Sequence, residues 1–273
     1  MSQDVYIPGA TQAWLTMLKE VYIFGQQVTV RNLDIVEVLH RSCKIDMKNP
    51  IISVKDRKLG LGFLMAEAAW IISGRNDVAS IRPYSKRIAE FSDDGYFFRG
   101  AYGPQIVQQL SYILENLQND LYSRQAVISI WKPSPPKSKD IPCTITVQFM
   151  VRAGLLHTFV NMRSSDCWLG VPYDWFNFSM LSRWVLLALK QAGVEHLDLG
   201  FLHFNAASQH IYKNNFMDVS SIIHQESPDW DTRTDSLMPF IEKAKTPQDL
   251  ILTLWELAYS QIATGEKENS SSW

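Results

Sequence analysis

Cys143 is the residue of this sequence whose type and position suggest the most chemistry. It follows Pro142 directly and opens a segment rich in β-branched residues, so its thiol can lie at a strand edge rather than in the core. A thiolate is a strong nucleophile, and this position suits covalent catalysis. A single cysteine is also often a small buried apolar residue, and the position alone does not decide between these interpretations.

The cysteines do not form a pattern of disulfides or metal ligands. Cys43, Cys143 and Cys167 are odd in number, and none belongs to a CxxC spacing. We therefore expect neither a disulfide framework nor a zinc site, and predict no metal.

Glu67 is a second chemical candidate, because it lies among apolar residues in the segment AEAAWII. An unpaired carboxylate in such surroundings is costly. It can be satisfied by a hydrogen bond to backbone, or it can serve as a general acid and base whose pKa is raised by burial.

The elements that must position these groups follow from hydrophobic periodicity. Helical spacing predicts core helices over residues 10–24, 61–72, 104–118 and 178–192, and an amphipathic helix over 246–263. Short segments rich in β-branched and aromatic residues predict strands over 124–131, 145–152 and 155–162. This order predicts a single α+β domain over 1–273, with a mixed or antiparallel sheet covered by helices and a flexible tail from about 264.

Composition excludes several classes of protein. The formal charge of -2 gives no basic field for a nucleic-acid polymer, although a few arginines suffice for a phosphate. No apolar run is long enough for a membrane span, and the start MSQDVYIPG does not resemble a secretory signal, so the cytoplasm is the expected location.

Several motifs around Cys143 carry a family resemblance. In chain order they are PC with TVQF, VNMRSSD, LGVPYD and HIY, and they are preceded by PI, AEAAWIISGRND, FSDDGYFFRGAYGPQ and SRQAVISIW. In this order the sequence resembles the thymidylate synthase family and its phage relatives, the deoxycytidylate hydroxymethylases, over roughly residues 28–216. The resemblance implies the thymidylate synthase fold, and it extends the expected location to a host cytoplasm if the chain is phage-encoded.

The resemblance implies four catalytic residues. Cys143 would add to C6 of a pyrimidine and turn C5 into a nucleophile. Glu67 would relay protons through water, Tyr102 would lie near C5, and Asp166 would meet the pterin of 5,10-methylenetetrahydrofolate.

The resemblance also implies residues that bind the nucleotide. Arg163, Arg31 and Ser164 would contact the phosphate, and Arg163 would also favour ionisation of the thiol. A surface salt bridge is the alternative for Arg163. His210 and Tyr212 would bind the sugar 3′-hydroxyl, although the preceding AASQ differs from the usual GGDT. Gln148, in TVQF, would be a further substrate contact.

Arg124 would reach the phosphate of a partner subunit, which implies a homodimer. Gln125 stands where the family usually has a second arginine, so one phosphate contact is lost.

Asp174 indicates the base. Thymidylate synthases resemble one another in having asparagine at this position, which suits uracil, whereas an aspartate can accept from N4 of cytosine and share a proton with N3. The same aspartate occurs in the phage deoxycytidylate hydroxymethylases, as does a threonine directly after the catalytic cysteine, which is Thr144 here. The alternative is that Asp174 caps a helix beginning near Trp175.

Two departures indicate that water, rather than hydride, completes the reaction. Thymidylate synthases exclude water with an active-site tryptophan and an apolar C-terminus. The tryptophan position falls at Ile88, and the tail GEKENSSSW ends without an apolar closing segment apart from Trp273.

These observations predict a homodimeric dCMP hydroxymethylase that uses 5,10-methylenetetrahydrofolate. A dCMP methylase and a thymidylate synthase remain open as alternatives. A CMP hydroxymethylase also remains open, since nothing in the sequence indicates a contact with the 2′ position of the sugar. A nucleotide- or RNA-binding regulator on the same fold is the non-enzymatic alternative.

Overall fold

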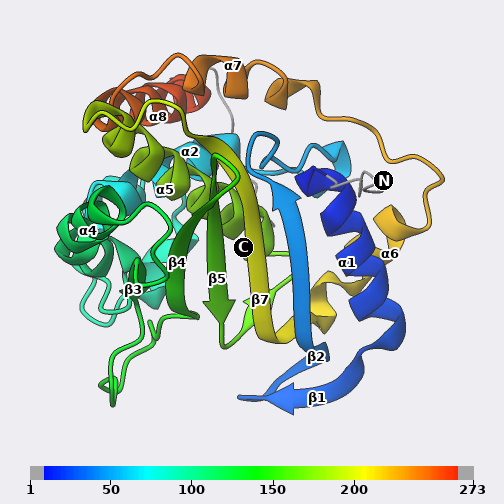
Figure 1. Ribbon diagram of the computed structural model, residues 1–273. Helices are drawn as coiled ribbons and strands as arrows, with labels where there is room; N and C mark the ends of the chain where they lie inside the picture. Colours follow the sequence, from blue (N-terminus) through cyan, green and yellow to red (C-terminus); the bar gives the residue numbers. More distant parts are fainter. Residues whose placement is uncertain (1–8, 264–273) are drawn as a thin grey trace.

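Segments rich in β-branched and aromatic residues pair into one mixed sheet, which the computed structural model describes with its helices over residues 9–263 (Figure 1). The spatial order is β1-β2-β7-β5-β4-β3, with β6 pairing alongside β7. Strand β7 is parallel to β5 and antiparallel to β2. The strands are β1 (Gln26–Val30), β2 (Leu33–Asp46), β3 (Val127–Ser129), β4 (Thr144–Arg152), β5 (Leu155–Met162), β6 (Ser165–Asp166) and β7 (Asp198–Tyr212).

Helices cover one face of this sheet. Helices α1 and α5 pack on the strands, while α2 packs against α4, α5 and α8. The helices are α1 (Ala10–Phe24), α2 (Leu61–Ile72), α3 (Val78–Ile81), α4 (Tyr102–Asn119), α5 (Val171–Gln191), α6 (Phe216–Ile223), α7 (Leu237–Ile241) and α8 (Pro247–Ala263), with 3₁₀ turns at Lys55–Arg57, Arg87–Phe91, Lys213–Asn215 and Thr232–Thr234. No helix within residues 9–263 is long and apolar enough to cross a membrane.

Side-chain alternation along β5 divides the sheet into a covered and an open face. Leu156, Thr158 and Val160 are buried, and the Thr158 hydroxyl bonds to Ser182 on α5. His157 and Phe159 point to the other side and are only partly buried. Figure 1 shows this side of β4, β5 and β7 turned toward the viewer, uncovered by the helices of the described range.

Two hairpin turns fix the register of the sheet. Arg31 and Asn32, between β1 and β2, both have positive φ, at 51° and 64°. Ala153 and Gly154 make the equivalent turn between β4 and β5. Two-residue turns of this kind match the right-handed twist of the strands they join. The first turn also places Arg31 at the tip of a hairpin.

The predicted α+β class with a mixed sheet is confirmed. Helices α1 and α2 and strand β5 have the predicted bounds, and α8 starts one residue later than predicted. Strand β3 is shorter than predicted, and β1, β2 and β7 were not predicted. The helix predicted over 178–192 begins at Val171, because Pro172 fits its first turn. The predicted tail from 264 lies outside the described residues.

Candidate active site

One continuous cavity opens where the ends of several strands meet the first turns of α4 and α5. It has two connected parts of about 340 Å³ each, one toward the arginines and one toward the acidic residues. The residues common to both parts are Arg31, Ile141, Arg163, Ser164, His210 and Tyr212. A cavity of this size with few convergent polar groups is typical of a small-molecule site.

Cys143 and Arg163 meet in this cavity because β4 and β5 are antiparallel neighbours. Cys143 immediately precedes β4, and Arg163 immediately follows β5. Arg163 donates from Nε to the Pro142 carbonyl (2.9 Å) and from Nη2 to the Ile141 carbonyl (3.0 Å). The same Nη2 lies 3.7 Å from the Cys143 Sγ. The guanidinium therefore holds the segment that carries the thiol and faces the thiol itself.

Burial raises the pKa of the Cys143 thiol above its ordinary value. The Arg163 and Arg31 guanidinium groups act in the opposite direction, while Asp174 and Asp140 add to the increase. The expectation that Arg163 would bring the thiol to ionise near neutral pH is thus not met in the free protein, because loss of hydration outweighs the attraction of the cation. Arg163 reduces the increase without reversing it.

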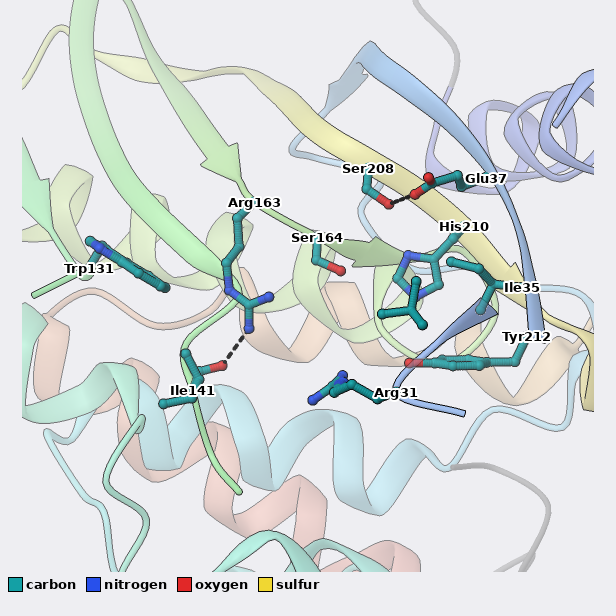
Figure 2. Close-up of a pocket in the computed structure, with 11 residues that line it drawn as sticks. Arg31, Ile35, Glu37, Trp131, Ile141, Arg163, Ser164, Ser208, His210 and Tyr212 are labelled. Carbon is teal, nitrogen blue, oxygen red and sulfur yellow. Dashed lines mark hydrogen bonds between the residues drawn. The ribbon is translucent and has the colours of Figure 1, made fainter. Parts of the chain in front are cut away.

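The arginine end of the cavity can receive an anion. Figure 2 shows Arg31 and Arg163 approaching this part of the cavity from different sides, with Ser164 beside Arg163 on the side toward His210. Arg163 also lies 5.8 Å from the ring centroid of Trp131. Two guanidinium groups and a hydroxyl around one space are well suited to phosphate oxygens.

The same end holds one carboxylate that the sequence did not point to. Glu37 on β2 accepts a 2.5 Å hydrogen bond from the Ser208 hydroxyl on β7, as the dashed line in Figure 2 marks. Both residues line the cavity beside His210.

Acidic residues gather at the opposite end. Glu67 on α2 accepts a 2.7 Å hydrogen bond from the Asn177 amide on α5, and burial raises its pKa to about 7. Asp174, one turn before Asn177, is partly buried, and its loss of hydration together with the nearby Glu67 and Asp166 holds its pKa well above the ordinary range. This direction favours the protonated form of Asp174 over that of an ordinary aspartate, since neighbouring carboxyl groups resist ionising together.

The remaining predicted catalytic groups line the same cavity. The Tyr102 hydroxyl accepts a 3.3 Å hydrogen bond from the Thr144 amide, and burial near Cys143 raises its pKa well above 10. Asp166 accepts from the amides of Trp168 and Leu169 through Oδ1. Its buried Oδ2 has no hydrogen-bond partner among residues 9–263.

His210 and Tyr212 lie on the end of β7 with their rings 5.2 Å apart and nearly perpendicular. Burial lowers the pKa of His210, so its ring is neutral at neutral pH. Its Nδ1 also lacks a partner within the described part of the chain. A neutral imidazole can accept a hydrogen bond from a hydroxyl group.

Two predicted substrate contacts do not reach this cavity. Gln148 lies on β4, where alternation turns it away from the buried Val147 and Phe149, and its amide donates to the Arg124 carbonyl at 2.8 Å. Gln148 therefore does not line the cavity of its own protomer, and its contact with substrate stays a prediction. Arg124 is exposed and does not line the cavity either.

The alternative role of Asp174 as a helix cap does not fit. Helix α5 begins at Val171 with Gly170 as its N-cap, so Asp174 lies inside the first turn. Asn177 was missed, although its position three residues after Asp174 places both on one helix face.

A family model described as thymidylate synthase matches residues 12–232. The chain is also 33% identical over 178 residues to a protein of Bacillus phage SP01 described as deoxyuridylate hydroxymethyltransferase. That match covers 57% of this chain and 46% of the phage protein, so the chain spans about half the length of this relative.

Replacing Arg163 by glutamine will raise the pKa of the Cys143 thiol further, because the cation that favours the thiolate is removed. The rate of iodoacetamide labelling of Cys143 should rise with pH in the unmodified protein and shift to higher pH in Arg163→Gln. Peptide mass spectrometry separates Cys143 from Cys43 and Cys167.

Arg152→Gln is the matched control, since its guanidinium lies at the far end of β4 and contacts the Tyr122 carbonyl. Equal labelling profiles for Arg163→Gln and the unmodified protein would show that Arg163 does not influence the thiol.

Proposed function

The chain belongs to the thymidylate synthase family, and from this premise we propose that it transfers a one-carbon unit from 5,10-methylenetetrahydrofolate to C5 of a pyrimidine nucleotide. The proposed reaction converts dCMP to 5-hydroxymethyl-dCMP. The observation that carries this choice is the carboxyl of Asp174, which lines the cavity that also contains Cys143 and Glu67 and whose raised pKa favours its protonated form.

The reaction begins at Cys143. Its thiolate forms a bond to C6, and the electrons of the C5–C6 double bond make C5 nucleophilic. C5 would take the one-carbon unit that bound 5,10-methylenetetrahydrofolate supplies, tetrahydrofolate would leave as the carbon–nitrogen bond to it breaks, and the C5 proton would pass through water to Glu67, which leaves an exocyclic methylene group on the pyrimidine. Water adds to that carbon and the thiolate leaves C6, which yields the hydroxymethyl product.

The residues present fit a reduced folate. The free Oδ2 of Asp166 is an acceptor for a pterin N–H, and its burial makes an unpaired state costly. Apolar side chains complete this part of the cavity: Trp70, Ile71, Ile88, Phe91, Phe98 and Leu169. When bound, the folate supplies the one-carbon unit, while these side chains hold its ring system.

Protonated Asp174 favours cytosine because N3 of cytosine has a higher proton affinity than O4 of uracil. Its hydroxyl can donate to N3 while its carbonyl accepts from N4. N3 of cytosine is basic and can take the proton as the thiolate adds, so the negative charge that the thiolate brings moves from the ring to the Asp174 carboxylate, which stays hydrogen-bonded to N3–H and N4–H. O4 of uracil is far less basic, which makes the same transfer unfavourable.

The second candidate is hydroxymethyl transfer to dUMP. The phage relative is named for deoxyuridylate, and a neutral carboxyl can also accept from N3–H of uracil and donate to O4. The relative's name supports the hydroxymethyl outcome for both candidates.

Ile88 supports addition of water rather than hydride. It lines the cavity at the position where the family resemblance places a tryptophan. A smaller aliphatic side chain leaves room for water near C5.

A homodimer completes the phosphate site in this proposal. Arg124 is exposed and remote from the cavity of its own protomer. The open face of the sheet carries His157, Phe159 and His203, with the last two rings stacked at 4.2 Å. A second copy seated on this face would bring its own Arg124 to the phosphate end.

The mass of the nucleotide product tests the proposed reaction. Incubation of dCMP with 5,10-methylenetetrahydrofolate should give a product heavier by one CH₂O unit, and CMP and dUMP are tested separately to read the sugar and the base. Replacing Asp174 by asparagine should shift the ratio of kcat/KM for dCMP over dUMP toward dUMP by ~10²-fold or more, because the site loses the proton that N3 receives.

Cys143→Ser should abolish turnover, while Cys43→Ser, which alters a cysteine outside the cavity, should not. Turnover of dUMP in preference to dCMP by the unmodified protein would refute the choice of base but retain the one-carbon transfer.

Replacing Ile88 by tryptophan should raise the fraction of methyl product, because the larger ring excludes water from C5. Hydride delivery converts the folate to dihydrofolate, whereas water addition leaves tetrahydrofolate, so dihydrofolate absorbance measures the partition. Ile88→Leu preserves volume and should leave the partition unchanged. An active Ile88→Trp enzyme that forms no additional dihydrofolate would contradict this role.

Mixed subunits test the dimer. Cys143→Ser and Arg124→Ala proteins should each be weakly active alone. After joint unfolding and refolding they should recover activity, because one site of the heterodimer combines an intact Cys143 with an intact Arg124 of the other chain. No recovery, or a monomer by light scattering, would contradict the shared site.

A further inference from the structure

Asn177 lines the cavity but has no role in the reaction proposed for it. It is 4% exposed and lines the cavity, although it lies seven residues into a helix whose neighbouring side chains are mostly apolar. Gly170, Asp174 and Asn177 follow one another at helical spacing, so they form a single stripe of α5 facing the cavity.

Glu67 sets the orientation of the Asn177 amide. Nδ2 donates to the Glu67 Oε2 at 2.7 Å, which is the amide orientation that the ionised form of Glu67 requires, because a carboxylate accepts and cannot donate. The oxygen end is consequently directed elsewhere. Oδ1 is buried and has no hydrogen-bond partner within residues 9–263.

A buried carbonyl oxygen without a partner is costly, and such an atom in a cavity lining identifies a donor that is missing until a ligand binds. Asp174, on the same stripe, is the group proposed to face the edge of the base that carries N3 and position 4. The exocyclic amine of cytosine has two hydrogens, and Asp174 accepts only one of them.

We propose that Asn177 is a second determinant of base choice, with its Oδ1 accepting the other N4 hydrogen of cytosine while its Nδ2 holds Glu67. This inference rests on the proposed function for its substrate. Uracil presents an acceptor, O4, at the same place, so Oδ1 would face another acceptor. Rotation of the amide would relieve that clash only by turning Oδ1 toward the Glu67 carboxyl, which removes the donor to Glu67.

The test uses binding as well as turnover. In a Cys143→Ser background, where no covalent bond forms, dCMP and dUMP are titrated by calorimetry into proteins with and without Asn177→Ala. The ratio of the two Kd values should move toward dUMP by about tenfold, because one hydrogen bond to cytosine is lost and one repulsion with uracil is removed. The ratio of kcat/KM in the Cys143 enzyme should move in the same direction.

Asn177→Asp separates specificity from packing. A carboxyl of the same shape can share a proton with Glu67 and still offer an oxygen to N4, so cytosine preference should persist within about threefold while turnover falls. Ser179→Ala is the matched control, because Ser179 is buried on the same helix, bonds to the Trp175 carbonyl and does not line the cavity. Its nucleotide ratio should not change.

The outcomes separate this inference from the function on which it rests. If the unmodified protein prefers dCMP and Asn177→Ala leaves the ratio of the dCMP and dUMP Kd values unchanged, the role of Asn177 is overturned and the proposed function is retained. Absence of any folate-dependent product overturns the function, while the Kd ratios still decide the role of Asn177. If Asn177→Ala does not fold, loss of cytosine preference in Asn177→Asp overturns the proposal and its retention supports it.

Discussion

The hydrogen bonds from Arg163 to the carbonyls of Ile141 and Pro142 are the contacts on which the cavity depends. They join the end of β5 to the segment that enters β4, and they place a permanent cation 3.7 Å from the only thiol that lines the cavity in the described range. Because the guanidinium is planar with several donors, one side chain binds two carbonyls, faces a thiol and still borders the anion site. A lysine could not satisfy these geometrical demands together.

The acidic end has the opposite electrostatic character, and burial rather than pairing sets its protonation. Glu67, Asp166 and Asp174 line the same part of the cavity, and loss of hydration is the largest cause of the raised pKa of each. A site that stores protons on buried carboxyl groups is prepared to give one to a basic ring nitrogen. The cavity therefore runs from a cationic end to an acidic end whose carboxyl groups favour their protonated forms.

The sequence indicated most of the residues that line the cavity, whereas it did not indicate all strands of the sheet. Helices α1 and α2 were found because their apolar spacing is local, and Cys143, Glu67 and Asp174 were found because short motifs mark them. Strand β7 was not found, since its Gly200, Ala206 and Ala207 have weak β-propensity and its conformation depends on pairing with both β2 and β5. The Asn177–Glu67 contact joins residues 110 positions apart, and no spacing rule within one helix reveals it.

The segment AASQ illustrates how a departure from a family pattern can be absorbed by neighbouring strands. Ser208 stands where the usual GGDT has an acidic residue, and the carboxylate at this place comes instead from Glu37 on β2, which accepts from the Ser208 hydroxyl. Gln209 replaces the threonine, and its buried amide donates to the carbonyl and hydroxyl of Ser165. These contacts join β7 to β2 on one side and to β6 on the other, close to His210. The 3′-hydroxyl pair proposed for this site can thus keep its place although the residues before it have changed, because strand pairing fixes the backbone and the replaced side chains bond across it.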